Sequence, residues 1–374
     1  MKKIITIICF ISCVASCKKD FQSSTTNALD NVSAASLKSP LELMYSDSMY
    51  EFVGVAVSKT GRMFTCYPLW NQPHKYDVVE IKSLTENKPY PNAWANSWNN
   101  GEDGLIKWVC VQSVYVDDED KLWVLDPASP YMNGVYQHSY KLVKFNLETN
   151  QPEKIYRFNY VADKNSYLND VRVDTKLNYA YITNSSEGGI LVIDLESGKT
   201  RQVLQGSPSV ISDPGYKFTI DGKQLKQNGA PAKFNSDGIA LTPDGTYLYY
   251  KPATDNRLYR IKTKYLRDEK LSSAVLASKV EYLGKFSASD GMIFDKQGNL
   301  YLSDAENYRI VKITPDLKMH VLISSPLLIW PDSFSIEDGY LYVSCSQLQK
   351  QPKYNTASPT WPPATPFTIY RLKL

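Results

Sequence analysis

The sequence repeats one pattern six times: a small or acidic residue opens a short apolar strand, a polar turn follows, and a second strand begins with Leu-Tyr, Leu-Trp or a similar pair. The first strands of the six copies are Val53–Ser58, Gln112–Asp117, Asn169–Asp174, Asp237–Leu241, Asp290–Asp295 and Asp332–Glu337. Successive copies begin roughly 42 to 68 residues apart, a spacing typical of one four-stranded propeller blade with variable loops. Because a single repeat cannot bury its own faces, the six copies must close into one ring. The sequence therefore predicts an all-β, six-bladed β-propeller.

The last repeat indicates how the ring closes. It contains three strand-like runs, Ser333–Ile336, Tyr340–Cys345 and Phe367–Lys373, whereas a blade needs four. The apolar run Leu41–Tyr45 precedes the first repeat and belongs to no blade of its own. Pairing this run with the last strand would remove an open sheet edge, so we expect a propeller over residues 41–374 that is closed by its N- and C-terminal strands.

The first residues of the chain have the pattern of an export signal. Two lysines are followed by the apolar run Ile4–Val14, which is too short to cross a bilayer, and by the small residues that a signal peptidase accepts. The segment Val14–Cys17 resembles a bacterial lipobox. We therefore expect residues 1–16 to be a lipoprotein signal peptide, Cys17 to carry the lipid, and residues 17–40, rich in Ser, Thr, Asn and Lys, to be a flexible tether. A plain secretory signal is the alternative.

The charge balance restricts the class of partner. The chain has 42 basic and 39 acidic residues, and removal of the two signal lysines leaves 40 basic residues against 39 acidic ones. Nucleic acids and anionic membranes bind basic surfaces, so a nearly neutral chain is unlike the proteins that bind either of them. Neutrality does not exclude small ligands or protein partners. We expect a monomer that binds a small molecule, contacts the membrane only through its lipid anchor, and lies on the extracytoplasmic side of the cell envelope.

The cysteines point to burial. Cys66, Cys110 and Cys345 remain after Cys17 and the signal peptide are set aside. An odd number without C-x-x-C spacing specifies neither a zinc site nor a disulfide framework. We expect these three side chains to be small buried hydrophobes, although the sequence leaves open whether any of them forms a disulfide.

Polar residues recur where the six innermost strands begin. These strands run outward from the same mouth of the channel, so their first residues should form a ring. Its members are Val53, Gln112, Asn169, Asp237, Asp290 and Asp332. Loops between the second and third strands should reach the same mouth, and they bring Trp70, Asp126, Tyr131, Asn184, Asp255, Asp304, Asn307 and Gln347 near it. The longest insertion, about Gly206–Phe234, is expected to cover one face.

Two interpretations of the acidic ring remain open. Each aspartate could cap its own turn by accepting backbone N–H bonds. As a set, crowded carboxylates raise one another's pKa unless a cation lies between them. Oxygen ligands without His or Cys suit Ca²⁺ or Mg²⁺, or equally an organic ammonium. If a metal binds, its expected ligands are Asn169, Asp237, Asp290 and Asp332.

Several longer segments resemble one known family. The segments are Gln112–Val114, Leu122–Asp126, Asp237–Asp244 with Leu258–Ile261, Ser289–Met292 and Trp330–Phe334. In this order they resemble the major royal jelly and yellow protein family over about residues 50–350. The resemblance implies a six-bladed propeller whose insect members are secreted, some binding biogenic amines in the central channel and some linked to dopachrome conversion. The paired cysteines of insect members are replaced here by Asp118–Asp120 and Tyr140, so their disulfides and insect-specific activities are not transferred.

A second resemblance rests on dipeptides. The Asp-Gly strand starts and Asn169-Asp170 are similar to gluconolactonase and paraoxonase propellers, in which the equivalent residues hold a divalent cation. We therefore expect a small ligand, cationic in character, or a divalent cation at the mouth. The alternatives are a metal-dependent lactonase or ester hydrolase and a protein-interaction scaffold. The expected ligand-binding residues are Gln112, Asn169, Asn184, Asp237, Asp290, Asp304 and Asp332, and catalytic residues are not assigned.

Overall fold

The computed structural model describes residues 40–158, 164–354 and 360–374. Residues Pro40–Leu374 form one compact unit. The predicted signal peptide over residues 1–16, Cys17 and nearly all of the expected tether lie outside the described residues. No helix among the residues described is long and apolar enough to cross a membrane.

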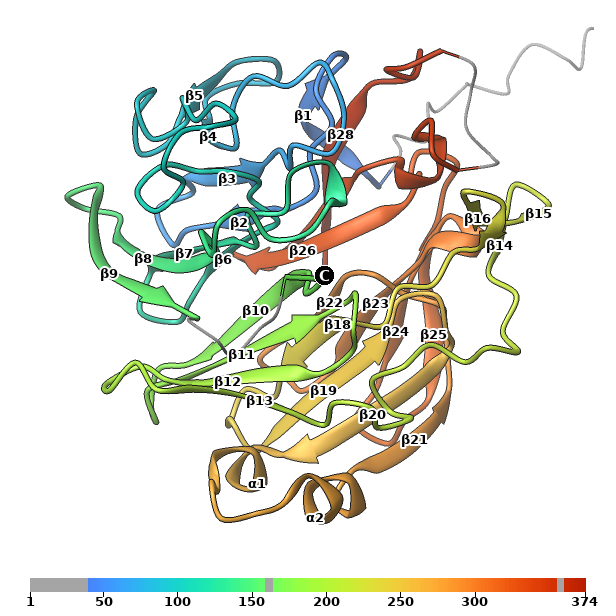
Figure 1. Cartoon of the computed structure of the whole chain (residues 1–374). Helices are drawn as coiled ribbons and strands as arrows, with labels where there is room; N and C mark the ends of the chain where they lie inside the picture. Colours follow the sequence, from blue (N-terminus) through green and yellow to red (C-terminus); the bar gives the residue numbers. More distant parts are fainter. Residues whose placement is uncertain (1–39, 159–163, 355–359) are drawn as a thin grey trace, which may run out of the picture. The chain divides into compact units, whose positions relative to one another are not determined.

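Six four-stranded antiparallel sheets surround a central channel (Figure 1). We number the sheets as blades 1 to 6 and give the strands of each from the inner to the outer one. Blade 1 contains β2 (Ala56–Val57), β3 (Met63–Cys66), β4 (Val78–Ile81) and β5 (Asn87–Pro89); blade 2 contains β6 (Ser113–Val116), β7 (Lys121–Asp126), β8 (Lys141–Asn146) and β9 (Gln151–Arg157); and blade 3 contains β10 (Leu168–Asp174), β11 (Tyr179–Asn184), β12 (Ile190–Asp194) and β13 (Thr200–Val203). Blade 4 contains β18 (Ser236–Leu241), β19 (Tyr247–Pro252), β20 (Arg257–Lys262) and β21 (Glu281–Lys285); blade 5 contains β22 (Met292–Phe294), β23 (Leu300–Asp304), β24 (Arg309–Ile313) and β25 (Met319–Ser324); and blade 6 contains β26 (Pro331–Glu337), β27 (Tyr340–Cys345), β28 (Phe367–Lys373) and β1 (Glu42–Asp47). The predicted six-bladed propeller is confirmed.

Helices are few and short. The α-helices α1 (Thr263–Arg267) and α2 (Ser273–Ser278) lie between β20 and β21, at the outer part of blade 4. Three 3₁₀ turns, η1 (Pro130–Met132), η2 (Ala305–Asn307) and η3 (Leu348–Lys350), lie in loops after the second strands of blades 2, 5 and 6. The propeller is therefore held together by packing of sheet on sheet.

The hydrophobic core is divided among the junctions between blades. Five of six clusters of buried side chains each join one blade to the next, and the sixth joins blades 1 and 2 and continues into the loops at one mouth of the channel. The second strands are buried on both faces because each lies between two neighbouring blades, as the fully buried β23 illustrates. The outer strands are exposed, as in β9, where only Tyr156 is buried. Cys66, Cys110 and Cys345 are buried, as the sequence predicts, and they are free, a point that the sequence left open.

The inner strands are crowded, which explains two of the Asp-Gly pairs. Each inner strand contacts the next one around the ring, from β2 through β26 and back to β2. A Cβ on Gly238 would lie 2.6 Å from the backbone oxygen of Asp290, and one on Gly291 would lie 2.6 Å from that of Asp332. Only glycine fits where two backbones approach this closely. The glycine of the motif therefore serves blade packing, and its aspartate is left to face the channel.

The two ends of the chain close the ring. β1 pairs antiparallel with β28, from Glu42 opposite Arg371 to Asp47 opposite Phe367. An ion pair of 2.8 Å between Arg371 Nε and Glu42 Oε2 joins the same two strands. The predicted closure by the N- and C-terminal strands is confirmed, and blade 6 contains strands from both ends of the chain.

Deletion of residues 367–374 tests the closure. The truncated chain loses β28, which leaves β1 without its partner and exposes the edge of β27. We expect a loss on the order of several kcal/mol in the free energy of unfolding, because blade packing and edge protection disappear together. Urea unfolding followed by tryptophan fluorescence measures it, with deletion of Leu374 alone as the control. An unchanged midpoint in the longer deletion would contradict closure.

Substitution of Gly291 tests the crowding of the inner strands. Gly291→Ala places a methyl group against the backbone oxygen of Asp332, which cannot move without disturbing blade 6. We expect the free energy of unfolding to fall by about 1–3 kcal/mol, the usual effect of overpacking. The matched control is Gly215→Ala, whose added Cβ lies 3.3 Å from the Asp213 side chain in a loop. Equal midpoints for the two variants in urea would show that the inner strands have room to spare.

Candidate functional site

A cavity of about 510 Å³ opens at one mouth of the channel. Five of the six predicted ring positions line it, namely Gln112, Asn169, Asp237, Asp290 and Asp332. The sixth, Val53, is fully buried in the core between blades 1 and 2. The repeat alignment therefore identified side chains that the fold brings to one opening, with their ligand-binding role still a prediction.

Two of the aspartates form a hydrogen-bonded pair. The carboxyl of Asp237 is hydrogen-bonded to that of Asp290. The second oxygen of Asp290, Oδ2, accepts a hydrogen bond of 2.7 Å from Trp330 Nε1. Asp237 Oδ1 is buried without a hydrogen-bond donor among the described residues. A carboxylate oxygen in this position is an acceptor that the protein itself leaves unsatisfied.

Burial and mutual repulsion shift the titration of these acids. Burial, followed by the charge of Asp290, raises the pKa of Asp237 well above its usual range. The same two causes raise the pKa of Asp332. Burial raises the pKa of Asp290 to about 6, although the hydrogen bonds from Asp237 and Trp330 oppose the shift. Near neutral pH the group therefore holds protons that ordinary carboxyls have released, and a cation could take their place.

The amide side of the ring is a chain of oriented hydrogen bonds. Trp70 Nε1 donates to Tyr167 Oη at 2.6 Å, and Tyr167 Oη donates to Gln112 Oε1 at 2.8 Å. Gln112 Nε2 then donates to Asn169 Oδ1 at 2.7 Å. Asn169 Nδ2 has no acceptor within the part of the chain that is described, so it remains a donor for a ligand or for water. Tyr167 has no counterpart in the repeat alignment, and sequence reasoning missed it.

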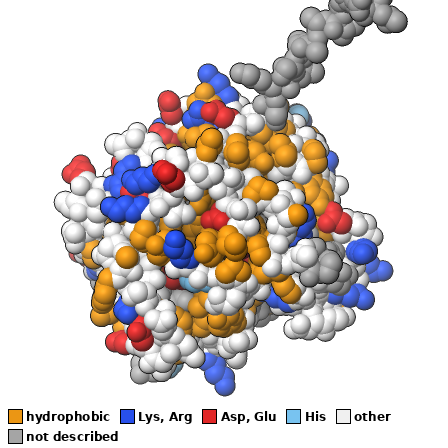
Figure 2. All heavy atoms as spheres, turned by 90° about the horizontal axis from the view of Figure 1, so that it is seen from above, with side chains coloured by type: hydrophobic (Ala, Val, Ile, Leu, Met, Phe, Trp, Pro, Cys, Tyr) orange, Lys and Arg blue, Asp and Glu red, His pale blue; other side chains and the backbone are white. Residues whose placement is uncertain are grey.

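Aromatic side chains form the walls above the acids. Trp70, Tyr167 and Phe234 line the cavity, and the rings of Trp70 and Tyr167 lie 6.4 Å apart. Behind Phe234, the rings of Trp330 and Tyr354 lie edge-on to it at 6.5 and 6.3 Å. Figure 2 shows one face of the molecule, on which hydrophobic side chains gather around the middle with acidic and basic groups among them. Aromatic faces near carboxylates attract organic cations.

Two charged residues outside the predicted set of ligand-binding residues lie nearby. Asp170, next to Asn169, is partly buried, and desolvation raises its pKa; its charge also raises the pKa values of the acids at the mouth. Arg172 Nη2 donates to the backbone oxygen of Met292 at 2.7 Å, which joins β10 to β22. These strands are not neighbours in the ring, so Arg172 crosses the channel. Only the direction of its side chain, invisible in the sequence, determines this.

The long insertion between blades 3 and 4 forms part of the cavity. It contains two small hairpins, β14 (Thr219–Ile220) with β15 (Lys223–Gln224) and β16 (Lys226–Gln227) with β17 (Ala230–Pro231). Gln227 and Phe234 line the cavity. Thr219 N donates to Glu306 Oε1 at 2.6 Å, and Gln227 forms a bridge with Tyr354. The insertion therefore reaches from blade 4 to blades 5 and 6, and part of it borders the mouth.

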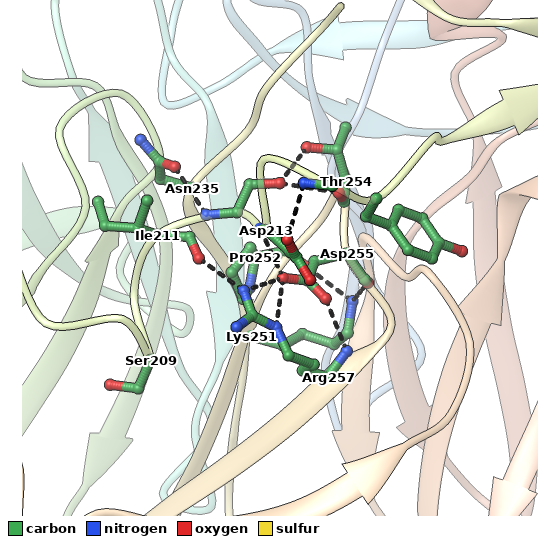
Figure 3. A network of polar contacts seen from close by, with 12 residues as sticks. Ser209, Ile211, Asp213, Asn235, Lys251, Pro252, Thr254, Asp255 and Arg257 are labelled. Atoms are coloured by element: carbon green, nitrogen blue, oxygen red, sulfur yellow. Dashed lines mark hydrogen bonds and ion pairs between the residues drawn. The ribbon is translucent and has the colours of Figure 1, made fainter.

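A polar network attaches the ends of this insertion to blade 4 (Figure 3). Asp255 Oδ2 accepts hydrogen bonds from Asp213 N at 2.9 Å and from Arg257 Nε at 2.8 Å. Arg257 Nη2 also donates to the backbone oxygen of Ile211 at 3.1 Å. Lys251 donates to the backbone oxygens of Pro252 and Asp255, both at 2.7 Å. The Asp255–Arg257 pair thus holds the start of the insertion, and at its end Phe234 N donates to Thr254 Oγ1 at 2.9 Å.

Two predicted site residues lie elsewhere. Asn184 and Asp304 are buried and do not line the cavity. Asn184 Oδ1 accepts a hydrogen bond of 3.1 Å from Tyr167 N, and Asp304 Oδ2 forms an ion pair of 2.6 Å with Arg309 Nε. Both side chains support loops beside the site, and neither lines the cavity.

The fit of the site to a metal is incomplete. No group of three or more His, Cys, Asp or Glu side chains within residues 40–158, 164–354 and 360–374 is arranged to hold a metal ion. The proposed metal ligands include the unsatisfied Oδ1 of Asp237, which a cation would suit, but the pairing of Asp237 with Asp290 turns these groups toward each other. As placed, the acids form a proton-sharing pair more readily than a metal cage.

Comparison with solved structures shows the same fold in distant proteins. A gluconolactonase from Xanthomonas campestris is 10% identical, with a TM-score of 0.52 over 88% of each chain. The calcium-binding protein regucalcin from Agrobacterium tumefaciens is 14% identical, with a TM-score of 0.50 over 89% of this chain and 93% of that one. At these identities the likeness establishes the propeller and nothing about its ligand.

Sequence comparison is more specific. Major royal jelly protein 7 of Apis mellifera is 27% identical over 321 residues, which are 74% of this chain and 68% of that protein. Major royal jelly protein 1 of the same species is 26% identical over 48% of this chain, and this match spans less than half of the relative's length, 42%. The family model described as "Major royal jelly protein" matches residues 109–358, more than half of the chain. The chain therefore belongs to the major royal jelly protein family.

Proposed function

We propose that this propeller binds a small organic cation at the acid-lined mouth of its channel. The observation that carries the proposal is the Asp237–Asp290 pair, in which Asp237 is buried and has one carboxylate oxygen without a donor among the described residues. Both acids line a cavity whose lining also includes aromatic rings. An ammonium group could donate to this oxygen and to Asp332, while an attached apolar body packs on Phe234 and Trp70. Charge and aromatic surface therefore favour the same ligand class.

Preorganisation supports this assignment. Trp330 holds Asp290, and the chain from Trp70 to Asn169 holds the amide side, so binding requires little ordering of side chains. Two lysines beside the mouth have their ammonium groups occupied by the protein. Lys251 donates to the backbone oxygens of Pro252, Asp255 and Ser289, and Lys233, which lines the cavity, donates to those of Asp213 and Tyr216. A ligand that neutralises the mouth must therefore bring its own positive charge.

A divalent cation, with hydrolysis of a lactone or ester, is the second candidate. The unsatisfied Asp237 oxygen favours it, since Ca²⁺ and Mg²⁺ prefer oxygen ligands. A bound metal would polarise the carbonyl of the substrate, and Asn169, Asp237, Asp290 and Asp332 would hold it. The paired acids turn toward each other instead of surrounding a metal, so we rank this candidate second to the organic cation.

Thermal melting with tyramine, a cationic aromatic amine, tests the proposal. A ligand that binds only the folded protein adds about 2.7 kcal/mol of stability at a hundredfold excess over its Kd. We expect tyramine to raise the melting temperature and its neutral analogue p-ethylphenol to leave it unchanged. Asp290→Asn should reduce the tyramine response, and Asp316→Asn, which alters an exposed aspartate that bonds its own turn, should preserve it.

The same experiment separates the two candidates. Stabilisation by Ca²⁺ or Mg²⁺, together with metal-dependent hydrolysis of gluconolactone that is lost in Asp290→Asn, would replace the organic cation with the metal-dependent hydrolase. No response to tyramine or to either metal, with Asp290→Asn as stable as the parent, would reduce the aspartates to turn caps.

The pH dependence of stability provides an independent prediction. Because the pKa values of Asp237, Asp290 and Asp332 are raised, the folded state holds protons that the unfolded chain loses above its ordinary carboxyl pKa of about 4. These groups therefore contribute full stability only below that pKa, and the contribution is lost as the pH rises through about 6, the value for Asp290, and beyond. Replacing a buried carboxyl with an amide should remove part of this loss.

We expect Asp237→Asn to gain stability relative to the parent as the pH increases from about 5 to about 8. Urea unfolding at a series of pH values measures the difference in free energy of unfolding between the two proteins. The titration of carboxyls elsewhere in the chain is the same in both proteins and cancels from this difference. Asp316→Asn again serves as the control. Parallel stability curves for Asp237→Asn and the parent would mean that the acids at the mouth titrate normally.

A further inference from the structure

A second large cavity lies beside the mouth, among the loops of blades 1 and 2. Its volume is about 780 Å³, within the range of small-molecule sites. Three segments surround it: residues 69–77 between β3 and β4, residues 93–109 between β5 and β6, and residues 130–137 between β7 and β8. We propose that this inter-blade cleft, as we call it, binds a neutral carbohydrate. The proposal does not depend on the cation site.

Aromatic rings line the cleft. Trp98 and Tyr136 line the cleft with their rings edge-to-face at 4.9 Å. Trp98 Nε1 and Tyr136 Oη both donate to the backbone oxygen of Glu102, each at 3.1 Å, so their polar ends are tied down. Tyr131, 47% exposed, lines the same cleft. Rigid, partly exposed rings of this kind offer flat apolar surfaces, which suit the C–H face of a sugar ring.

Exposed amide side chains also line the cleft. Asn100, Asn133 and Gln137 line the cleft and are exposed. Within the described residues, their side chains form no hydrogen bond with the protein. Each amide carries two donors and an acceptor oxygen, and can bind adjacent hydroxyl groups that both donate and accept. Three such groups beside aromatic rings are suited to a ligand with many hydroxyls.

Few charged side chains line the cleft. The charged or titratable side chains on its described lining, apart from tyrosines, are His74, Lys75 and Asp77. Asp77 is 3% exposed, and its Oδ1 lies 3.9 Å from His74 Nε2. Lys75 Nζ lies 5.0 Å from the centre of the Tyr76 ring. No arginine fork is present on this lining to recognise a phosphate or carboxylate. A neutral polar ligand therefore fits better than an ion.

The loop between β7 and β8 is held in a demanding conformation. Its non-glycine residues with positive φ are Ala128 (50°), Tyr131 (57°), Met132 (56°), Gln137 (42°) and His138 (54°). Such strained residues persist only where the surroundings impose the conformation, which is common at ligand clamps. Backbone hydrogen bonds impose this loop conformation. Tyr131 N donates to Leu69 O, and Tyr136 N donates to Ala128 O, both at 2.7 Å. The loop thus presents Tyr131 and Tyr136 to the cleft.

Calorimetric titration of the full chain with maltotriose, cellotriose, chitotriose and xylotriose tests the proposal. We expect at least one of these neutral trisaccharides to bind with a Kd in the millimolar range or tighter. Trp98→Ala should weaken this binding by roughly tenfold or more, because it removes one stacking surface. Trp94→Ala is the matched control, since Trp94 is exposed nearby but does not line the cleft.

A second variant guards against misfolding of Trp98→Ala. Asn100→Ala combined with Asn133→Ala removes two side chains that make no hydrogen bond with the described residues, so its melting temperature should match the parent while sugar binding weakens. Gln151→Ala, at the exposed start of β9, is the control for losing an amide. Failure of all four trisaccharides to bind at millimolar concentrations, or binding that survives both cleft variants, would overturn the proposal.

Discussion

The pairing of β1 with β28 is the contact on which the rest of the structure depends. A propeller blade buries its faces only against its two neighbours, so a ring that is open at one junction leaves two faces and an edge exposed to water. Here the strand before the first repeat completes the last blade, through six residues of β1 and an ion pair between Glu42 and Arg371. Closure holds the six inner strands around one axis, and this in turn brings their first residues together.

Crowding at that axis produces the chemistry of the mouth. The inner strands approach so closely that Gly238 and Gly291 have no room for a Cβ. Hydroxyls near the ends of second strands join neighbouring blades, as when Thr183 Oγ1 donates to the backbone oxygen of Asp237 at 2.7 Å. Near the end of the second strand of blade 4 a lysine replaces the hydroxyl residue, and Lys251 Nζ donates to Ser289 O at 3.3 Å. Backbones held this rigidly keep the acids desolvated and close together, so desolvation first and mutual repulsion second raise their pKa values.

The two cavities differ in chemistry although they share a wall. Asn133 and Gly134 line both of them, so the loop between β7 and β8 separates an acidic mouth from a cleft lined by amides and aromatic rings. The mouth is built from the repeated inner strands, whereas the cleft is built from loops that differ from blade to blade. A repeated framework thus supplies a charged centre, and its variable loops supply a second surface with different selectivity.

The sequence by itself determined the repeated strands, the six blades, the strand that closes them, and five of the residues at the mouth, because strand spacing and side-chain alternation are local properties of the chain. It also showed the family through segments such as Trp330–Phe334. Only the tertiary structure decided where side chains point. Asn184 and Asp304 turn to Tyr167 N and Arg309. The Asp237–Asp290 pair and the crossing of Arg172 to blade 5 likewise arise from segments far apart in the chain, whose distances no local pattern encodes.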